Sequence, residues 1–260
     1  MTTWIATESD AAVAIQAIRE HPVCGYDSEF DGVDIGSQSC VGRSRLDVFS
    51  IAVPTTKRNP IEYYEPTSWV FEGALIGVPA VRDFLEDGRF RKVIHNRTVD
   101  EHTARNAGVR IRGGLCTLNM ARWIYPERSS LPCGNFDLDS LCKWRVGFGK
   151  TEDFDDLLGY DDTVPYTAEV SKRFCLACQS SDCRKKKAPH DIREERLVEV
   201  TRTKIVRKIR ALSTIRPDGA GASLFPRYLA YAAADAELAL ILYECMLMDG
   251  QKERPYPWGL

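Results

Sequence analysis

The stretch that decides the fold is Val23-Cys24-Gly25-Tyr26-Asp27-Ser28-Glu29-Phe30. Its apolar start and its two carboxylates predict a buried strand with a charged end. Because side chains alternate between the two faces of a strand, Asp27 and Glu29 point the same way and Ser28 points to the other face. Two neighbouring carboxylates repel each other unless a cation joins them. The pair therefore predicts half of a metal site, and the alternative is a solvated strand end.

Two later segments offer carboxylates that could complete this site. An apolar run breaks into a polar turn and then a helix, and Asn96 and Asp100, four positions apart, are expected to share one helical face. In a second helix, rich in Ala and Leu, Tyr231 and Asp235 have the same spacing. The alanines between them would let this helix pack closely against a sheet. Four acids and a tyrosine would thus come from one strand and two helices.

These segments, in this order, resemble the three exonuclease motifs of the DnaQ-like (DEDD) superfamily of 3′-5′ exonucleases. The histidine branch of that superfamily has a His where this chain has Ala230, whereas Tyr231 is typical of the tyrosine (DEDDy) branch. That branch includes ribonuclease D and the proofreading domains of family A DNA polymerases. The resemblance covers most of residues 1–150 and then residues 225–248. It implies an α/β fold of the ribonuclease H-like type, with a mixed five-stranded sheet flanked by helices.

The resemblance also implies a mechanism with two divalent ions, either Mg²⁺ or Mn²⁺, which carboxylate-rich sites suit. Asp27 would bridge the two ions. Glu29 and Asp235 would hold the ion that binds the attacking water, and Asp100 would support the second ion. Tyr231 has an ordinary pKa near 10 and is a poor base at neutral pH, so we expect it to orient the water by hydrogen bonding.

The expected substrate is the 3′ end of single-stranded DNA or RNA. Asn96 is expected to touch the terminal nucleotide, and Phe30 to stack or wedge beside its base. We expect DNA slightly more than RNA, because the helical domain that ribonuclease D carries after its nuclease domain is missing here. Three alternatives stay open: a ribonuclease D-like exoribonuclease, a proofreading subunit bound to a DNA polymerase or replication complex, and a non-catalytic nucleic-acid-binding module.

Residues 150–224 depart from the family pattern and are expected to form an insertion. The insertion contains a compact set of thiol and imidazole ligands, namely Cys175, Cys178, Cys183 and His190. These are the ligands that zinc prefers, and the segment has few large apolar residues with which to form a core. We expect a structural Zn²⁺ in the loop 175–190. The alternative is that the cysteines are free thiols near a basic turn.

The insertion is also locally basic. Lys185, Lys186 and Lys187 lie inside the expected zinc loop, where they would attract the phosphate backbone of a substrate. The spacing of Ile205, Ile209 and Leu212 predicts the apolar stripe of a long helix from about residue 192 to residue 215. The alternative for these charges is a solvated face without a ligand.

Length and composition limit the classes of protein to which this chain can belong. The chain has 260 residues, enough for one sizeable core, and we expect a single exonuclease domain over residues 1–260. Its formal net charge of −2 does not exclude a nuclease, because carboxylates and basic residues cancel in the sum. The sequence shows no secretory signal and no apolar run long enough to span a bilayer. The nine cysteines are therefore expected to be reduced, in a cytoplasmic or nucleoid-associated protein without a membrane partner.

Overall fold

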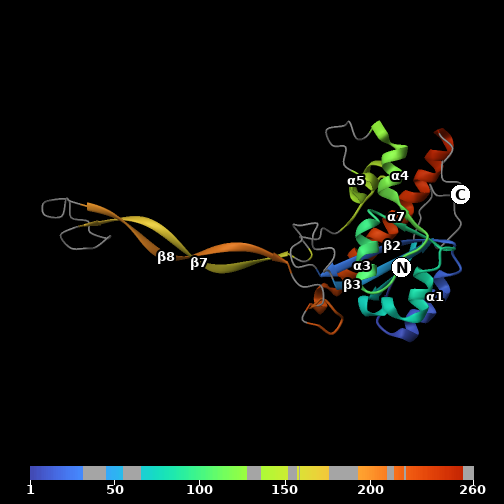
Figure 1. Cartoon of the computed structure of the whole chain (residues 1–260), viewed down its shortest axis with the longest axis horizontal. Coiled ribbons are helices and arrows are strands. Elements are labelled where there is room, and N and C mark those ends of the chain that lie inside the picture. The colour runs from blue at the N-terminus through green and yellow to red at the C-terminus, as the bar shows by residue number, and fades with distance from the viewer. Residues whose placement is uncertain are drawn as a thin grey trace. The chain divides into compact units, whose positions relative to one another are not determined.

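A computed structural model of the chain describes residues 1–31, 45–54, 66–127, 136–151, 157, 159–175, 193–209, 214–219 and 221–253. The chain divides into two compact units, which are coloured by residue number in Figure 1. The first unit contains Met1–Leu158 and Ala211–Leu260, and the second contains Gly159–Arg210. Among the described helices, none combines the length and the hydropathy that crossing a bilayer requires.

The first unit is built on a mixed sheet of six strands, in the order β1-β4-β3-β2-β5-β6. The strands are β1 (Thr2–Ile5), β2 (Val23–Asp31), β3 (Arg45–Pro54), β4 (Pro66–Glu72), β5 (Arg91–Ile94) and β6 (Gly114–Cys116). β3 runs antiparallel to β2 and β4, whereas β5 runs parallel to β2 and to β6. The expectation of a mixed α/β sheet is confirmed. The expected count of five strands is wrong, because β1 pairs in parallel with β4 at the edge.

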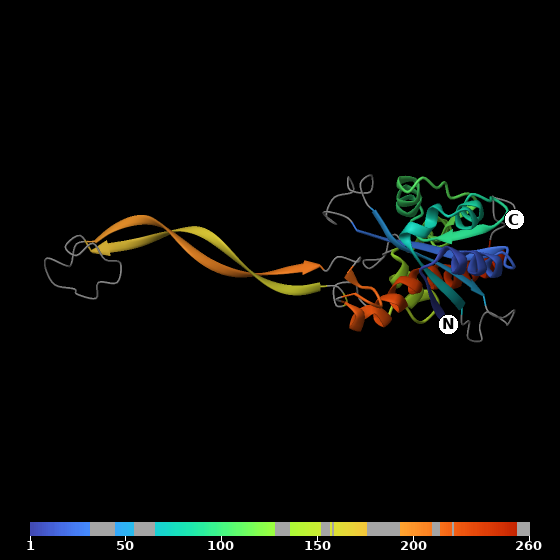
Figure 2. The same cartoon turned by 90° about the horizontal axis from the view of Figure 1, so that it is seen from below.

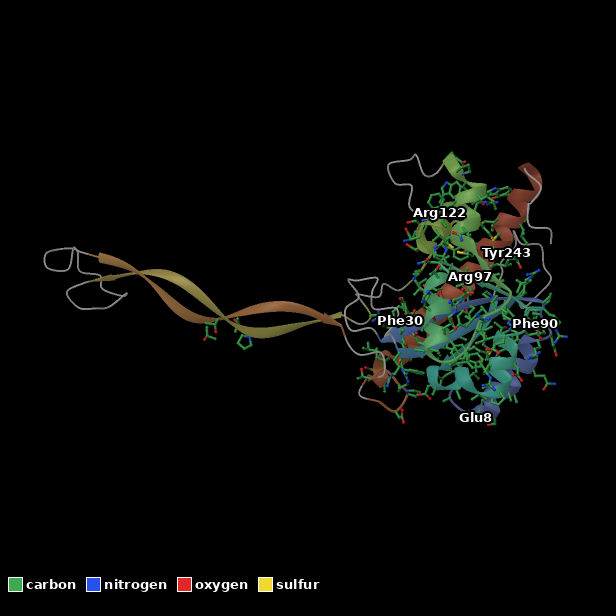
Figure 3. All side chains as sticks on the ribbon, viewed as in Figure 1. Glu8, Phe30, Phe90, Arg97, Arg122 and Tyr243 are labelled. Atoms are coloured by element: carbon green, nitrogen blue, oxygen red, sulfur yellow. The ribbon has the colours of Figure 1, made fainter. Side chains whose placement is uncertain are left out.

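Helices cover both faces of this sheet (Figure 2). One face carries α1 (Glu8–Ile18), the 3₁₀ turn η2 (Gly73–Gly77), α2 (Pro79–Leu85) and α3 (Thr98–Asn106). The other face carries α4 (Thr117–Ile124), α5 (Leu138–Arg145) and α7 (Phe225–Glu253). The 3₁₀ turn η5 (Ala222–Leu224) directly precedes α7. The first face is filled by buried aromatic rings, and those of Phe49 and Phe71 stack 4.8 Å apart. Side chains fill the space between sheet and helices (Figure 3).

The contact between β2 and α7 is unusually close. A Cβ atom on Gly25 would lie 1.9 Å from the carbonyl oxygen of Ala236, so no larger residue fits at this position. On α7, Ala232, Ala233 and Ala236 are buried, as the alanine-rich sequence predicts. Small residues on both elements therefore bring the backbone of the helix against the strand that carries the first two acids.

The far end of α7 is fixed by a polar network. Asp249 accepts hydrogen bonds from the hydroxyl of Tyr125, after α4, and from the guanidinium of Arg145, the last residue of α5. Helices α4, α5 and α7 are thereby tied together by one carboxylate. This network, together with the close contact at Gly25, fixes the position of the long helix along the sheet.

The second unit is a two-stranded antiparallel ribbon of β7 (Gly159–Cys175) and β8 (Arg193–Ile209). The long helix expected from residue 192 to residue 215 is therefore wrong. β-Branched residues recur through this segment, at Val198, Val200, Thr203, Ile205 and Val206, and such residues favour a pleated strand. The helical spacing of three apolar residues was a weaker signal than this composition.

Candidate active site

Three carboxylates meet where the end of β2 faces α7. Asp27 and Glu29 lie on the face of β2 that α7 covers, and Asp235 comes from α7 itself. The oxygen atoms that these three side chains offer lie within 4.8 Å of one another. The alternation along β2 and the close approach at Gly25 together produce this cluster.

Burial disfavours the ionised form of all three carboxylates. Burial raises the pKa of Asp27 and of Asp235 above the usual range and raises the pKa of Glu29 to about 8, and the carboxylates near Asp27 and Glu29 add to the effect. Asp27 Oδ2 and Asp235 Oδ1 are buried, and neither has a hydrogen-bond partner among the described residues. Buried carboxylate oxygens without donors fit a cation, and an all-oxygen set suits Mg²⁺ or Mn²⁺.

Asp100 approaches the cluster from α3, on the other face of the sheet. It is 4% exposed and accepts a hydrogen bond of 2.7 Å from the hydroxyl of Ser28, which points to that face as the alternation predicts. Burial raises the pKa of Asp100 to about 7, and its charge helps to raise the pKa of Asp27. The charge of Asp100 therefore acts on the cluster. Its carboxylate is hydrogen-bonded to Ser28, however, and is not one of the three whose oxygens lie within 4.8 Å of one another.

A cation that the sequence analysis missed lies in this cluster. Lys150 follows α5 in the chain, and its Nζ lies 2.7 Å from Asp235 Oδ2. The same ammonium lies 5.4 Å from the centre of the Tyr231 ring, so it contacts two of the expected site residues on α7. Its charge lowers the pKa of Asp27 and Glu29, against the larger effect of burial. No motif marks Lys150, which stands in a short Gly-containing segment far from Asp235 in the sequence.

Asn96 and Phe30 lie at the ends of the elements that carry the acids. Asn96 is exposed in the turn before α3 and has a left-handed φ of 55°, so the expectation that it shares a helical face with Asp100 is wrong. Phe30, which is labelled in Figure 3, is half-buried. It pairs with Leu46 of β3, beyond a bulge in the ladder. Their contacts with substrate stay predictions.

The expected zinc loop falls almost entirely outside the described residues. Cys175 is the last residue of β7, whereas Cys178, Cys183 and His190 lie outside the described ranges. Lys185, Lys186 and Lys187 also lie outside them. The zinc site, the basic loop and the insertion over residues 150–224 therefore stay predictions.

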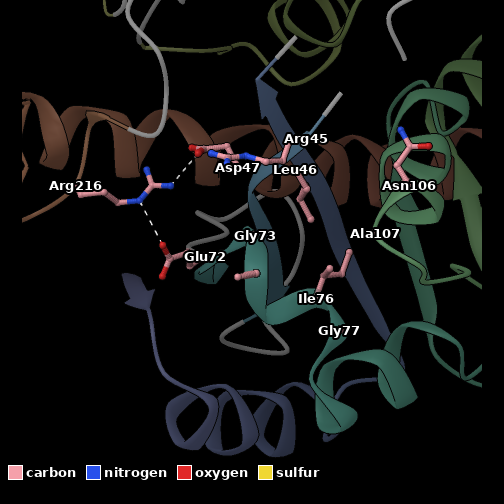
Figure 4. A pocket seen from close by; sticks show the side chains of 11 residues that line it. Arg45, Leu46, Asp47, Glu72, Gly73, Ile76, Gly77, Asn106, Ala107 and Arg216 are labelled. Atoms are coloured by element: carbon pink, nitrogen blue, oxygen red, sulfur yellow. Dashed lines mark hydrogen bonds and ion pairs between the residues drawn. The ribbon is translucent and has the colours of Figure 1, made fainter. Parts of the chain in front are cut away.

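Figure 4 shows residues that line a cavity beside the start of β3. The cavity has a volume of about 680 Å³, and none of the three clustered acids lines it. The bulge leaves Asp47 without a partner on β2, and this carboxylate accepts hydrogen bonds from Arg216, at 2.9 Å, and from the hydroxyl of Tyr228, at 3.0 Å. Tyr228 stands one turn before Tyr231 on α7. Asp47 thus anchors the start of α7, from which Tyr231 and Asp235 project.

An acid cluster of this kind, formed at a strand end and completed by a helix, could hold the divalent ions of a metal-dependent hydrolase. A family model described as 3'-5' exonuclease matches residues 2–172. The chain belongs to this family of 3′-5′ exonucleases, whose members use divalent metal ions, and it is an enzyme of the DEDD type. No curated protein sequence matches the chain.

Solved structures with a similar fold include RNase D of Trypanosoma brucei, which is 14% identical, with a TM-score of 0.58 over 98% of this chain and 66% of that one. The same enzyme in complex with RNA U12 is also 14% identical, with a TM-score of 0.57 over 98% of this chain and 64% of that one. Brucella melitensis NrnC bound to pGG is 12% identical, with a TM-score of 0.50 over 97% of this chain and 83% of that one. At such identities the matches show the fold alone, which is the ribonuclease H-like exonuclease fold.

Proposed function

We propose that the protein removes nucleotides from the 3′ end of single-stranded RNA with the help of two divalent ions. The observation that carries this proposal is the cluster of Asp27, Glu29 and Asp235, whose oxygens lie within 4.8 Å of one another and include two buried atoms that no donor among the described residues reaches. Ions bound there would activate a water molecule and stabilise the leaving oxygen of the phosphodiester.

Each side chain has a distinct role in this proposal. Asp27 would help to hold both ions, Glu29 and Asp235 would hold the ion that activates the attacking water, and Asp100 would support the other ion. Ser28 supports this last role, because its hydroxyl orients the Asp100 carboxylate from the neighbouring position on β2. Tyr231 lies one helical turn before Asp235, on the same face of α7, from which its hydroxyl can orient the attacking water.

RNA is favoured over DNA by two observations. The segment from Tyr231 to Asp235 is similar to the third motif of ribonuclease D, and the solved structures with a similar fold include an RNase D in complex with RNA U12 and an NrnC bound to pGG. The expectation of DNA rested on where the sequence ends, and it no longer counts, because this sequence spans only 66% of the RNase D chain that it matches. Hydrolysis of DNA is the second candidate, because the family includes enzymes that act on either polymer.

Digestion of matched 5′-labelled single-stranded RNA and DNA, in Mg²⁺ and in Mn²⁺, tests this function. We expect a ladder that shortens from the 3′ end of the RNA, and no cleavage by an Asp27→Ala variant. Asp83→Ala is the matched control, because Asp83 is an exposed acid on α2 and its loss should leave the rate unchanged. A ladder on DNA alone would replace the proposal with its second candidate, and a fully active Asp27→Ala variant would refute the site assignment.

A further inference from the structure

The pairing of β7 with β8 assigns every residue of the ribbon to one of two faces. The register runs without a break from Gly159 opposite Ile209 to Cys175 opposite Arg193. Residues directly opposite each other lie on the same face, and successive residues alternate between faces. Even-numbered residues pair with even-numbered residues throughout, so one face consists of the even-numbered positions of both strands and the other of the odd-numbered positions.

The two faces differ in chemistry. The three aromatic residues of the ribbon, Tyr160, Tyr166 and Phe174, all belong to the even-numbered face. That face also has five Lys or Arg residues against two Asp or Glu residues, whereas the odd-numbered face has three against four. Thr163 and Thr201, on the odd-numbered face, are exposed and typical of a solvated surface. The asymmetry would not exist on the helix that the sequence analysis expected for residues 192–215.

Aromatic and basic residues are also interleaved along the even-numbered face. Lys208 lies opposite Tyr160 and Arg202 lies opposite Tyr166, with Lys204 between these two pairs on β8. The segment from Tyr160 to Tyr166 spans about 20 Å of strand. Alternating rings and positive charges bind single-stranded nucleic acid without regard to sequence, because bases stack on the rings while Lys and Arg pair with the phosphates.

A second protein is the competing occupant, since the same face has valines such as Val198 and Val200. The cores of protein–protein interfaces are depleted in Lys, and burying five cations beside only two acids would be costly. A polyanion such as a nucleic acid would neutralise the excess positive charge of this face. A two-stranded ribbon is also only marginally stable by itself in water, so a ligand along its length would add stability.

We propose that the even-numbered face of the β7–β8 ribbon binds single-stranded nucleic acid and retains long substrates while their 3′ ends are cut. The retention of substrate rests on the function proposed above, whereas binding by the ribbon does not. Long strands should therefore depend on the ribbon, and strands of two or three nucleotides should not.

Charge reversal on the two faces provides matched variants of the full chain. Arg202→Glu, Lys204→Glu and Lys208→Glu together change the even-numbered face, and Arg173→Glu, Arg193→Glu and Arg207→Glu together change the odd-numbered face by the same charge. Binding is measured by fluorescence anisotropy with a labelled single-stranded RNA of about 30 nucleotides, in chelator so that no hydrolysis occurs. The even-numbered triple variant should bind at least about tenfold more weakly, with a salt dependence shallower by about 2 in log–log slope. The odd-numbered variant should bind within about twofold of the wild type.

A pair of neighbouring single substitutions tests stacking separately from charge. Tyr166→Ala should weaken binding about tenfold without changing the salt slope, whereas Thr167→Ala, on the other face, should have no effect. Thermal unfolding identifies any variant that fails to fold, and in that case Lys204→Gln with Lys208→Gln replaces the reversals. Equal losses from both faces, or from neither, would overturn the proposal.

Three further measurements separate this proposal from its alternatives. Turnover of a dinucleotide should be unchanged in the even-numbered variant while turnover of the long RNA falls, and an equal fall for both would refute retention by the ribbon. If the wild type hydrolyses neither RNA nor DNA, the function proposed above fails, and the anisotropy still decides whether the ribbon binds. Light scattering that shows a dimer dissociating in the even-numbered variant, with RNA affinity unchanged, would assign the face to a second copy of the chain instead.

Discussion

The ammonium of Lys150 lies 2.7 Å from Asp235 Oδ2, beside the carboxylates that are expected to hold the divalent ions. The Lys150 side chain is 25% exposed and that of Asp235 is 17% exposed, so solvent only partly screens the pair. In the absence of metal, this ammonium is the one counter-charge that the described residues place in contact with Asp235. Lys150 therefore stabilises the acid cluster when no ion is bound, and a bound ion has to compete with it.

Lys150→Met should lower the melting temperature of the metal-free protein by about 5 °C, which corresponds to about 2 kcal/mol. The cause is that the substitution leaves the half-buried carboxylates without their nearest positive charge. Mg²⁺ should restore the melting temperature and should half-saturate the variant at a lower concentration than the wild type. Lys143→Met is the control, because the 60%-exposed Lys143 side chain pairs with Asp139 at the surface. Equal effects of the two substitutions would contradict this role of Lys150.

The stability of the metal-free protein should fall as the pH rises from about 5 to about 8. Burial raises the pKa of Glu29 to about 8 and that of Asp100 to about 7, both above the values that these groups have in an unfolded chain. The folded state therefore holds protons that the unfolded state releases, and stability is present at low pH and lost as the pH rises. We expect a loss of at least about 2 kcal/mol by thermal unfolding in chelator. Mg²⁺ should remove most of it above pH 7, whereas a melting temperature that rises over this range in chelator would show that the acids are not buried as described.

Ser28→Ala should destabilise the protein by about 1 to 2 kcal/mol and reduce its activity. The hydroxyl of Ser28 donates to the buried Asp100 carboxylate at 2.7 Å. Ser50→Ala is a sharp control. Ser50 is also buried, on β3, but its hydroxyl has no hydrogen-bond partner in the described part of the chain, so its removal should be neutral or slightly stabilising. Denaturant unfolding of the two variants should therefore differ in sign or clearly in size.

Tyr231→Phe should lower kcat about 100-fold while leaving Mg²⁺ affinity unchanged, because the lost hydroxyl orients water and does not hold the ions. Tyr228→Phe, one turn earlier on α7, removes a hydroxyl that donates to Asp47 at 3.0 Å. That variant should lose about 1 to 2 kcal/mol of stability and much less of its rate. Single-turnover assays and thermal unfolding distinguish the two effects. A Tyr231→Phe enzyme that cuts at the wild-type rate would leave Tyr231 with a structural role only.

The acid cluster could be predicted from the sequence because the spacing of its residues determines in which direction their side chains point. Alternation along β2 separates Asp27 and Glu29 from Ser28, and a four-residue spacing puts Tyr231 and Asp235 on one face of α7. The alanines near Asp235 predicted the close packing, although its most demanding position, Gly25, lies on the strand. Local patterns were sufficient wherever one element determined where its own side chains point.

Other features depend on contacts between distant segments, which no local pattern records. Lys150 reaches Asp235 only because the segment after α5 returns to α7, and Asp47 reaches Tyr228 only because of a bulge in β3. The helix expected over residues 192–215 failed for a different reason. Apolar residues at helical spacing coincide there with β-branched residues, and the pairing with β7 decides between the two structures.

The order of the four acids along the chain determines when the site can form during translation. Asp27 and Glu29 are translated early, Asp100 later, and Asp235 only after both strands of the ribbon. A growing polypeptide that has not yet released α7 from the ribosome carries three of the four acids and lacks the side chain that completes the cluster. We expect such a nascent chain, or a fragment truncated before α7, to be inert. Under the function proposed above, a new copy of the enzyme cuts no RNA, including its own messenger, until α7 has left the ribosome.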